Sequence, residues 1–111
     1  MKNILLIITI ISLVLISRYT FSKESDFNTC IKNADHPANN TGGPEWDDLN
    51  VKNTLSVCTS AYLNNPESKE IIRSLARIHY KNKDFSKTHN LLIKGVKKKD
   101  EYSIYLMGLL F

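Results

Sequence analysis

The fold is decided by residues 66–96, which read PESKEIIRSLARIHYKNKDFSKTHNLLIKGV. On both sides of a polar turn at residues 81–84, apolar residues recur three and four positions apart, the spacing of one face of an α-helix. Asp84 stands just before the second apolar run, where its carboxylate can cap a helix. The stretch therefore predicts two amphipathic helices joined by a short turn, an αα-hairpin.

Helical periodicity continues on both sides of this hairpin. We expect Asp47 or Asp48 to cap the helix before the hairpin, Asn65 to cap the first hairpin helix, and Asp100 to cap a helix after it. No convincing strand pattern occurs outside the N-terminal apolar run. The sequence thus predicts an all-α domain of about five helices. Their apolar stripes lie in residues 24–34, 51–62, 66–80, 85–96 and 101–111.

A loop separates the first two of these helices. Residues 36–46, HPANNTGGPEW, contain two of the three prolines and two adjacent glycines, and a residue before proline is driven away from helical dihedrals. Trp46 is the only large apolar side chain of the loop. We expect it to anchor the loop on the hairpin, with stacking against a ligand as the alternative.

The N-terminus has the pattern of a segment that directs export. A single Lys2 precedes an uncharged, apolar run over residues 4–17, which is shorter than the ~20 residues that a membrane-spanning helix needs. This pattern is typical of a secretory signal. We expect residues 1–22 to be a cleaved signal peptide and residues 23–111 to form the exported domain, periplasmic or secreted. The alternative is an uncleaved anchor that contacts the membrane only through residues 4–17.

The chain has two cysteines, Cys30 and Cys58. In an oxidising compartment, two cysteines of a small domain usually pair. The closed segment of 29 residues predicts a stabilisation of about 3–4 kcal/mol from loop entropy. Zinc is the rival, with His36 nearby, but two Cys and one His without C-x-x-C spacing make a poor zinc site. We therefore expect a disulfide, no metal site and no cofactor.

Charge is distributed unevenly along the chain. Residues 23–67 carry three basic and seven acidic side chains, a balance of −4, whereas residues 68–111 carry ten and four, a balance of +6. Lysine-rich helix faces are usually simply solvated, although such asymmetry can also attract an acidic partner. Aromatic residues are not interleaved with the basic ones, so we do not expect nucleic acid as a partner.

The sequence also repeats itself. A set of mostly small residues recurs 34 positions later, which indicates a repeat architecture. The pairs are Thr54 and Thr88, Cys58 and Leu92, Ala61 and Gly95, and Pro66 and Asp100.

The hairpin resembles the tetratricopeptide pattern LGxxYxxxGxYxxAxxxFxxA. Residues 27–111 are more similar still to the Sel1-like branch found in exported bacterial proteins. Four positions depart from the family pattern, where His79 replaces an aromatic residue, Lys83 a glycine, and Thr88 and Gly95 alanines. The signature positions are Leu75, Ala76, His79, Lys83, Phe85, Thr88, Leu92 and Gly95, and the Sel1-like layout adds Cys30, His36-Pro37, Cys58, Asn65-Pro66 and Met107-Gly108.

This resemblance implies a solenoid of helical hairpins, a fold whose signature residues specify packing and not a ligand. It further implies a scaffold of the bacterial envelope that binds a protein or an extended peptide along a concave face. Arg73, Arg77 and Tyr80 are then the expected exposed contacts, together with Tyr105 and Phe111. The competing hypothesis is a membrane-tethered, non-catalytic structural or regulatory module of the envelope.

Sequence patterns of catalysis are missing. The chain contains no H-E-x-x-H, no G-x-S-x-G, no phosphate-binding loop and no S-x-x-K. We therefore do not expect an enzyme. A hydrolase is the less favoured alternative and would depend on His79 or His89, both of which lie in or near apolar stripes and are expected to be core or rim residues.

The last segment, residues 101–111, is apolar on nearly every side of a helix. Repeat arrays normally end in a polar cap. We expect this segment either to pack against a second copy or a partner, or to mark a truncated reading frame.

Overall fold

The computed structural model describes residues 2–110, with Lys2 and residues 15–23 described by their backbone alone. Phe111, one of the predicted contact residues, lies outside the described residues. Every regular element of the described chain is helical, which confirms the all-α prediction. The elements are α1 (Lys2–Ala34), the short 3-10 turns η1 (Pro37–Asn39) and η2 (Trp46–Asp48), α2 (Val51–Asn64), α3 (Lys69–Lys81), α4 (Phe85–Lys97) and α5 (Glu101–Leu110).

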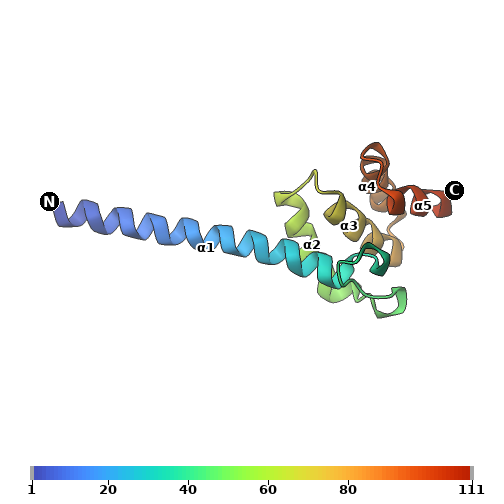
Figure 1. Ribbon diagram of the computed structural model, residues 1–111, viewed down its shortest axis with the longest axis horizontal. Coiled ribbons are helices and arrows are strands. Elements are labelled where there is room, and N and C mark those ends of the chain that lie inside the picture. The colour runs from blue at the N-terminus through green and yellow to red at the C-terminus, as the bar shows by residue number, and fades with distance from the viewer. Residues whose placement is uncertain (1, 111) are drawn as a thin grey trace.

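Helix α1 is continuous over 33 residues and extends far beyond the rest of the molecule (Figure 1). The sequence predicted a separate helix at residues 24–34, and this boundary is wrong. No Gly or Pro interrupts residues 2–34, so nothing in the backbone ends the helix earlier. The predicted cleavage after residue 22 falls inside α1 and stays a prediction.

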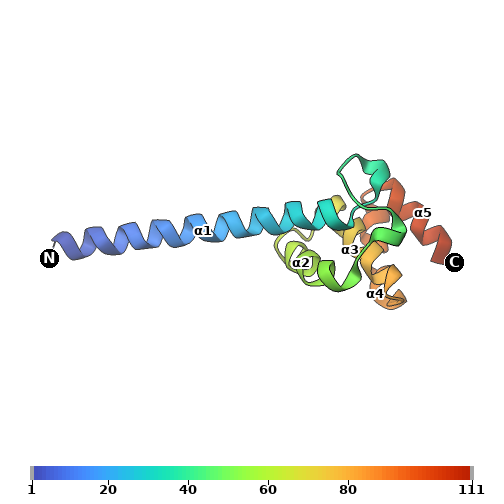
Figure 2. The same ribbon diagram turned by 90° about the horizontal axis from the view of Figure 1, so that it is seen from below.

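The two ends of α1 have different surroundings. The apolar side chains of residues 4–14 are all exposed, whereas the other end packs on α2 and α3 (Figure 2). There, Ser60 Oγ donates a hydrogen bond of 2.9 Å to the Asp26 carboxylate, and Ala34 is fully buried. Within the described residues, none of the helices combines the length and the apolar character needed to cross a membrane.

Helix α3 lies at the centre of the domain. Residues 71–79 are all buried, because α3 packs on α1, α2 and α4, while α4 also packs on α5. Sequential helices thus contact each other along the chain. The buried apolar side chains are Cys30, Ala34, Leu49, Cys58, Ala61, Ile71, Ile72, Leu75, Ala76, Ile78, Leu91, Leu92 and Leu106.

Two of the predicted helix caps are confirmed. Asp84 Oδ1 accepts a hydrogen bond of 3.4 Å from the Lys87 amide at the start of α4. Asp100 Oδ2 accepts one of 3.0 Å from the Ser103 amide at the start of α5. The turn between α3 and α4 also lies where the sequence predicts it, with Lys83 in the left-handed region at a φ of 61°.

The other two predicted caps are wrong. Helix α2 is capped by Asn50, whose side chain accepts a hydrogen bond of 3.0 Å from the Asn53 amide, because Leu49 is extended and inserts into the core. Helix α3 is capped by Ser68. Asn65 instead ends α2, where its amide and its side chain both donate to the Ala61 carbonyl.

The 34-residue repeat marks equivalent buried positions. Thr54, Cys58 and Ala61 are buried in α2, and their counterparts Thr88, Leu92 and Gly95 are buried in α4. The cap residues Asn50 and Asp84 also stand 34 positions apart. A Cβ atom on Gly95 would collide with Ser103 Oγ, so the glycine allows α5 to approach α4 closely.

The predicted disulfide is present. Cys30 of α1 and Cys58 of α2 are joined, with their Cα atoms 4.9 Å apart, and both residues are completely buried. The bridge fastens α1 to the rest of the domain near its packed end.

Candidate functional site

A buried ionic network connects α3 with Asp35, which directly follows α1, and with Asp100, which caps α5. Arg73 Nε and Nη2 donate to the two oxygens of Asp35, at 2.7 and 3.0 Å, and Arg73 Nη1 donates to Asp100 at 2.9 Å. The sequence predicted an exposed Arg73, and this is wrong, because Arg73 is only 6% exposed. Both carboxylates are buried as well, so the two negative charges hold the guanidinium inside the protein.

Asp35 also orders the loop between α1 and α2. Its carboxylate accepts hydrogen bonds from the His36 amide at 2.8 Å and from the Thr41 hydroxyl at 2.9 Å. A Cβ atom on Gly43 would collide with the Asp35 carbonyl oxygen, so the loop passes close to the end of α1. The loop is thereby fixed over one side of α3.

Arg77 stands one turn further along α3 and is 1% exposed, so the prediction that it is exposed is also wrong. Its Nη1 donates to the carbonyl oxygens of Ala34 and Asp35, at 3.2 and 2.9 Å. Among the described residues, no carboxylate forms an ion pair with Arg77. Its Nε is buried without a hydrogen-bond partner. Arg77 therefore carries a buried charge that only neutral groups satisfy.

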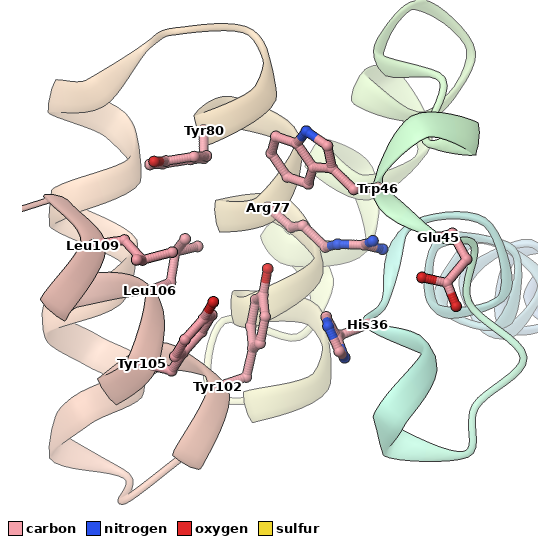
Figure 3. A pocket seen from close by; sticks show the side chains of 9 residues that line it. All are labelled: His36, Glu45, Trp46, Arg77, Tyr80, Tyr102, Tyr105, Leu106 and Leu109. Carbon is pink, nitrogen blue, oxygen red and sulfur yellow. The ribbon is translucent and has the colours of Figure 1, made fainter.

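Arg77 forms part of the floor of a cleft between α3, α5 and the loop. The cleft has a volume of about 260 Å³, somewhat below the usual 300–1,000 Å³ of drug-sized ligand sites. Figure 3 shows Tyr80 and Trp46 on one side of Arg77, and Tyr102 and Tyr105 on the other. Three of the five predicted contact residues, Arg77, Tyr80 and Tyr105, thus line one cleft.

Trp46 anchors the loop on α3, as the sequence predicts. Its ring contacts Tyr80 edge to face at a centroid distance of 5.7 Å, and Arg77 Cζ lies 5.8 Å from the ring centroid. Lys81 Nζ fastens the same segment, since it donates to the carbonyl oxygens of Trp46 and Leu49 at 2.6 and 2.8 Å. The indole remains 38% exposed and is available at the cleft.

The wall formed by α5 is aromatic and apolar. Tyr105 is 61% exposed and Leu109 is 54% exposed, whereas Leu106 is buried. Tyr102 stacks at a tilt on His36, with 4.7 Å between the ring centroids, and its hydroxyl points toward Arg77 in Figure 3. Helix α5 is therefore apolar on a buried and on an exposed side, in line with its sequence.

The electrostatics of the cleft reflect the uncompensated Arg77. Burial, and then the charge of Arg77, lower the pKa of His36 below its ordinary 6.5, so His36 is largely neutral at pH 7. Its Nδ1 accepts a hydrogen bond of 3.1 Å from the Ala38 amide, which fixes the tautomer. Burial raises the pKa of Tyr102 above its ordinary 10, against the opposing effect of Arg77. Glu45 is the acidic residue of the lining, at its rim.

The remaining candidates lie elsewhere. His79 is 8% exposed, on a different side of α3, and His89 on α4 is half-buried. Within the described residues, no three His, Cys, Asp or Glu side chains are grouped so that they could hold a metal ion. Glu45 and Tyr102 could not be assigned a role from the sequence, because only the fold brings the loop and α5 together on α3.

No family model matches the chain, and neither a curated protein nor a solved structure matches it significantly. The resemblance to Sel1-like repeats therefore stays a prediction, and the cleft has to be interpreted from its own geometry.

Proposed function

We propose that this protein is an exported helical scaffold of the bacterial envelope that binds an extended peptide segment of a partner protein in the cleft. The observation that carries the proposal is the combination of exposed aromatic walls with a buried arginine that lacks a carboxylate partner. Exposed aromatic side chains around a small cavity are typical of the energetic centres of protein interfaces. The Arg77 charge at the floor suits the carbonyl or carboxylate oxygens of a peptide.

Two further observations support export. The buried Cys30–Cys58 disulfide fits an oxidising compartment. Residues 4–14 pack on nothing in the domain, so removal of a signal peptide at residue 22 would leave the packed end of α1 in place. N-terminal sequencing of the exported form tests this part of the proposal. A start near Lys23 supports it, and an intact N-terminus contradicts it.

The binding proposal is tested with a random peptide library displayed on phage and selected on the purified protein. Tyr105→Ala is the decisive variant, because Tyr105 lines the cleft and is largely exposed. Ile104→Ala is the matched control, since Ile104 is the next residue of α5, is 51% exposed and does not line the cleft. Affinities are measured by fluorescence polarisation with the selected peptides.

We expect Tyr105→Ala to weaken binding at least about tenfold, as for a residue at the centre of an interface. Ile104→Ala should change the affinity less than about twofold. A selection that yields no binding peptide, or peptides that bind both variants as tightly as the unchanged protein, would contradict the proposed function.

A further inference from the structure

A second hollow lies between α2 and α4, where it is floored by α3. Its volume is about 460 Å³, within the range of about 300–1,000 Å³ that is usual for small-molecule sites. Leu75 and His79 of α3 line this groove, whereas Arg77 and Tyr80 line the cleft. At about 100° per residue, these two pairs point to opposite sides of α3. The groove is thus separate from the proposed peptide site.

The middle of the groove is apolar. Leu55 of α2, Leu75 of α3 and Leu91 of α4 meet there, and Leu75 and Leu91 are only 3% and 7% exposed. Leucines from three helices thus contribute to the apolar lining of the groove. Such a surface gains free energy when an alkyl chain displaces water from it.

The charged side chains along the groove are all positive. Among the described residues of its lining, none is acidic, whereas Lys87 and Lys94 are both present. Lys94 is held at one end, because its Nζ donates to the Tyr62 hydroxyl at 2.9 Å and to the Pro66 carbonyl at 3.0 Å and lies 4.0 Å from the exposed Glu67 carboxylate. The hydrogen bond with Tyr62 raises the pKa of Lys94, which therefore stays cationic.

Lys87 is the accessible cation. Its side chain is 67% exposed, and its ion-pair partner among the described residues is the partly exposed Asp84, at 3.6 Å. A surface pair of this kind contributes little and is readily exchanged for another anion. Lys87 lies near the N-terminal end of α4, whereas Lys94 lies near its C-terminal end.

His79 provides an unpartnered polar group on the same lining. It is 8% exposed, and its Nδ1 has no hydrogen-bond partner among the described residues. Burial lowers the pKa of His79, with a smaller contribution in the same direction from Lys87 against the opposing charge of Asp84. The ring is therefore neutral at pH 7 and compatible with an apolar ligand. A buried polar atom without a partner is unusual in a native protein and calls for an explanation.

We propose that the groove binds an anionic amphiphile of the fatty-acid type. Its carboxylate pairs with Lys87, next to His79, and its alkyl chain lies along Leu55, Leu75 and Leu91. The apolar floor selects for the chain, and Lys87 and Lys94, the charged residues of the lining, select for a negative head. A zwitterionic or cationic amphiphile of the same chain length lacks this complementarity.

The probe is dodecanoate, used below its micelle concentration and titrated into the purified protein by isothermal calorimetry. Dodecyltrimethylammonium is the comparison with the same chain and the opposite charge. The exposed apolar residues of α1 also attract alkyl chains. Binding in the groove is therefore measured as the difference in dodecanoate binding between the unchanged protein and the Thr59→Trp variant. Thr59 is exposed at the edge of the groove, and an indole at this position fills it.

We expect one saturable dodecanoate site that Thr59→Trp removes. Lys87→Gln should weaken this site about fivefold, as for the loss of one exposed charge-assisted contact. Lys97→Gln is the matched control, because Lys97 is an exposed lysine of α4 outside the groove, and it should leave the affinity unchanged. Thermal unfolding of all three variants confirms that they are folded.

Three results would overturn the proposal. One is the absence of a site sensitive to Thr59→Trp, and another is equal binding of dodecyltrimethylammonium at that site. The third is a concentration-dependent oligomer in light scattering that Thr59→Trp dissociates while no dodecanoate binds, which would assign the groove to a second copy. None of these outcomes depends on peptide binding in the cleft.

Discussion

Arg73 and Arg77 stand one turn apart on α3, and both are buried, yet they occupy two very different regions. Arg73 lies in a closed ionic network with Asp35 and Asp100. Arg77 lies at the floor of a cleft and finds only carbonyl groups for its Nη1 and no partner for its Nε. The difference separates two uses of a buried arginine. The first fastens helices together, and the second brings a positive charge to the floor of the cleft.

The largest expected effect comes from breaking the closed network. Arg73→Met leaves Asp35 and Asp100 buried without their counter-charge, and removing one partner of a buried ion pair costs about 3–5 kcal/mol. We expect a loss of this size in the free energy of unfolding, measured by urea denaturation. Asp35 also holds the loop between α1 and α2, so the loop and the helices should unfold together. We therefore expect a single unfolding transition whose urea midpoint is lowered.

Lys98→Met is the control for this prediction. Lys98 forms an ion pair of 2.8 Å with Glu67, which is 75% exposed, and such surface pairs contribute about 0–1 kcal/mol. A loss for Arg73→Met as small as that for Lys98→Met would show that the buried network does not stabilise the fold.

The same comparison shows what could be predicted from the sequence. Local spacing predicted the αα-hairpin and the caps Asp84 and Asp100, and the presence of two cysteines predicted the Cys30–Cys58 bridge. All of these predictions are confirmed. The burial of Arg73 could not be predicted in this way, because its partners lie 38 and 27 positions away. A charged side chain is by default assigned to the surface, and only tertiary structure overrides this default.

The cleft was partly predictable for a similar reason. The resemblance to Sel1-like repeats implied that Arg77, Tyr80 and Tyr105 are partner contacts, and the structure brings these three together at the cleft. Glu45 and His36 come from a loop with two prolines and two glycines, whose path no periodicity encodes. Hydrogen bonds to Asp35 set this path, and Asp35 itself carried no signal in the sequence beyond its charge.

A smaller effect is expected from the second arginine. Arg77→Met removes two hydrogen bonds to carbonyls but also removes a buried charge that no carboxylate compensates. The expected loss is about 1–2 kcal/mol, because a hydrogen bond to a charged group contributes about 1.5–3 kcal/mol and the desolvation of the charge is recovered. Urea denaturation under the conditions used for Arg73→Met measures it. A loss equal to or greater than that of Arg73→Met would contradict the distinction between the two regions.

The smallest effect concerns the titration of His36, which reports the charge of the cleft. Its pKa lies below the ordinary 6.5, so the unfolded chain binds more protons than the folded chain just below that pH. The stability that neutral His36 contributes is therefore complete above pH 6.5 and is lost as the pH falls toward the folded-state pKa. The titration is followed by NMR at the imidazole protons of His36.

Two variants should move this pKa in opposite directions. After burial, the charge of Arg77 is the main cause that lowers the pKa of His36. Glu45 raises this pKa, and Arg73 has the smallest influence on it. Arg77→Met should therefore raise the pKa of His36 toward 6.5, and Glu45→Gln should lower it further. If Arg77→Met left the titration unchanged, its charge would not reach the cleft, and the contrast with Arg73 would be one of burial geometry alone.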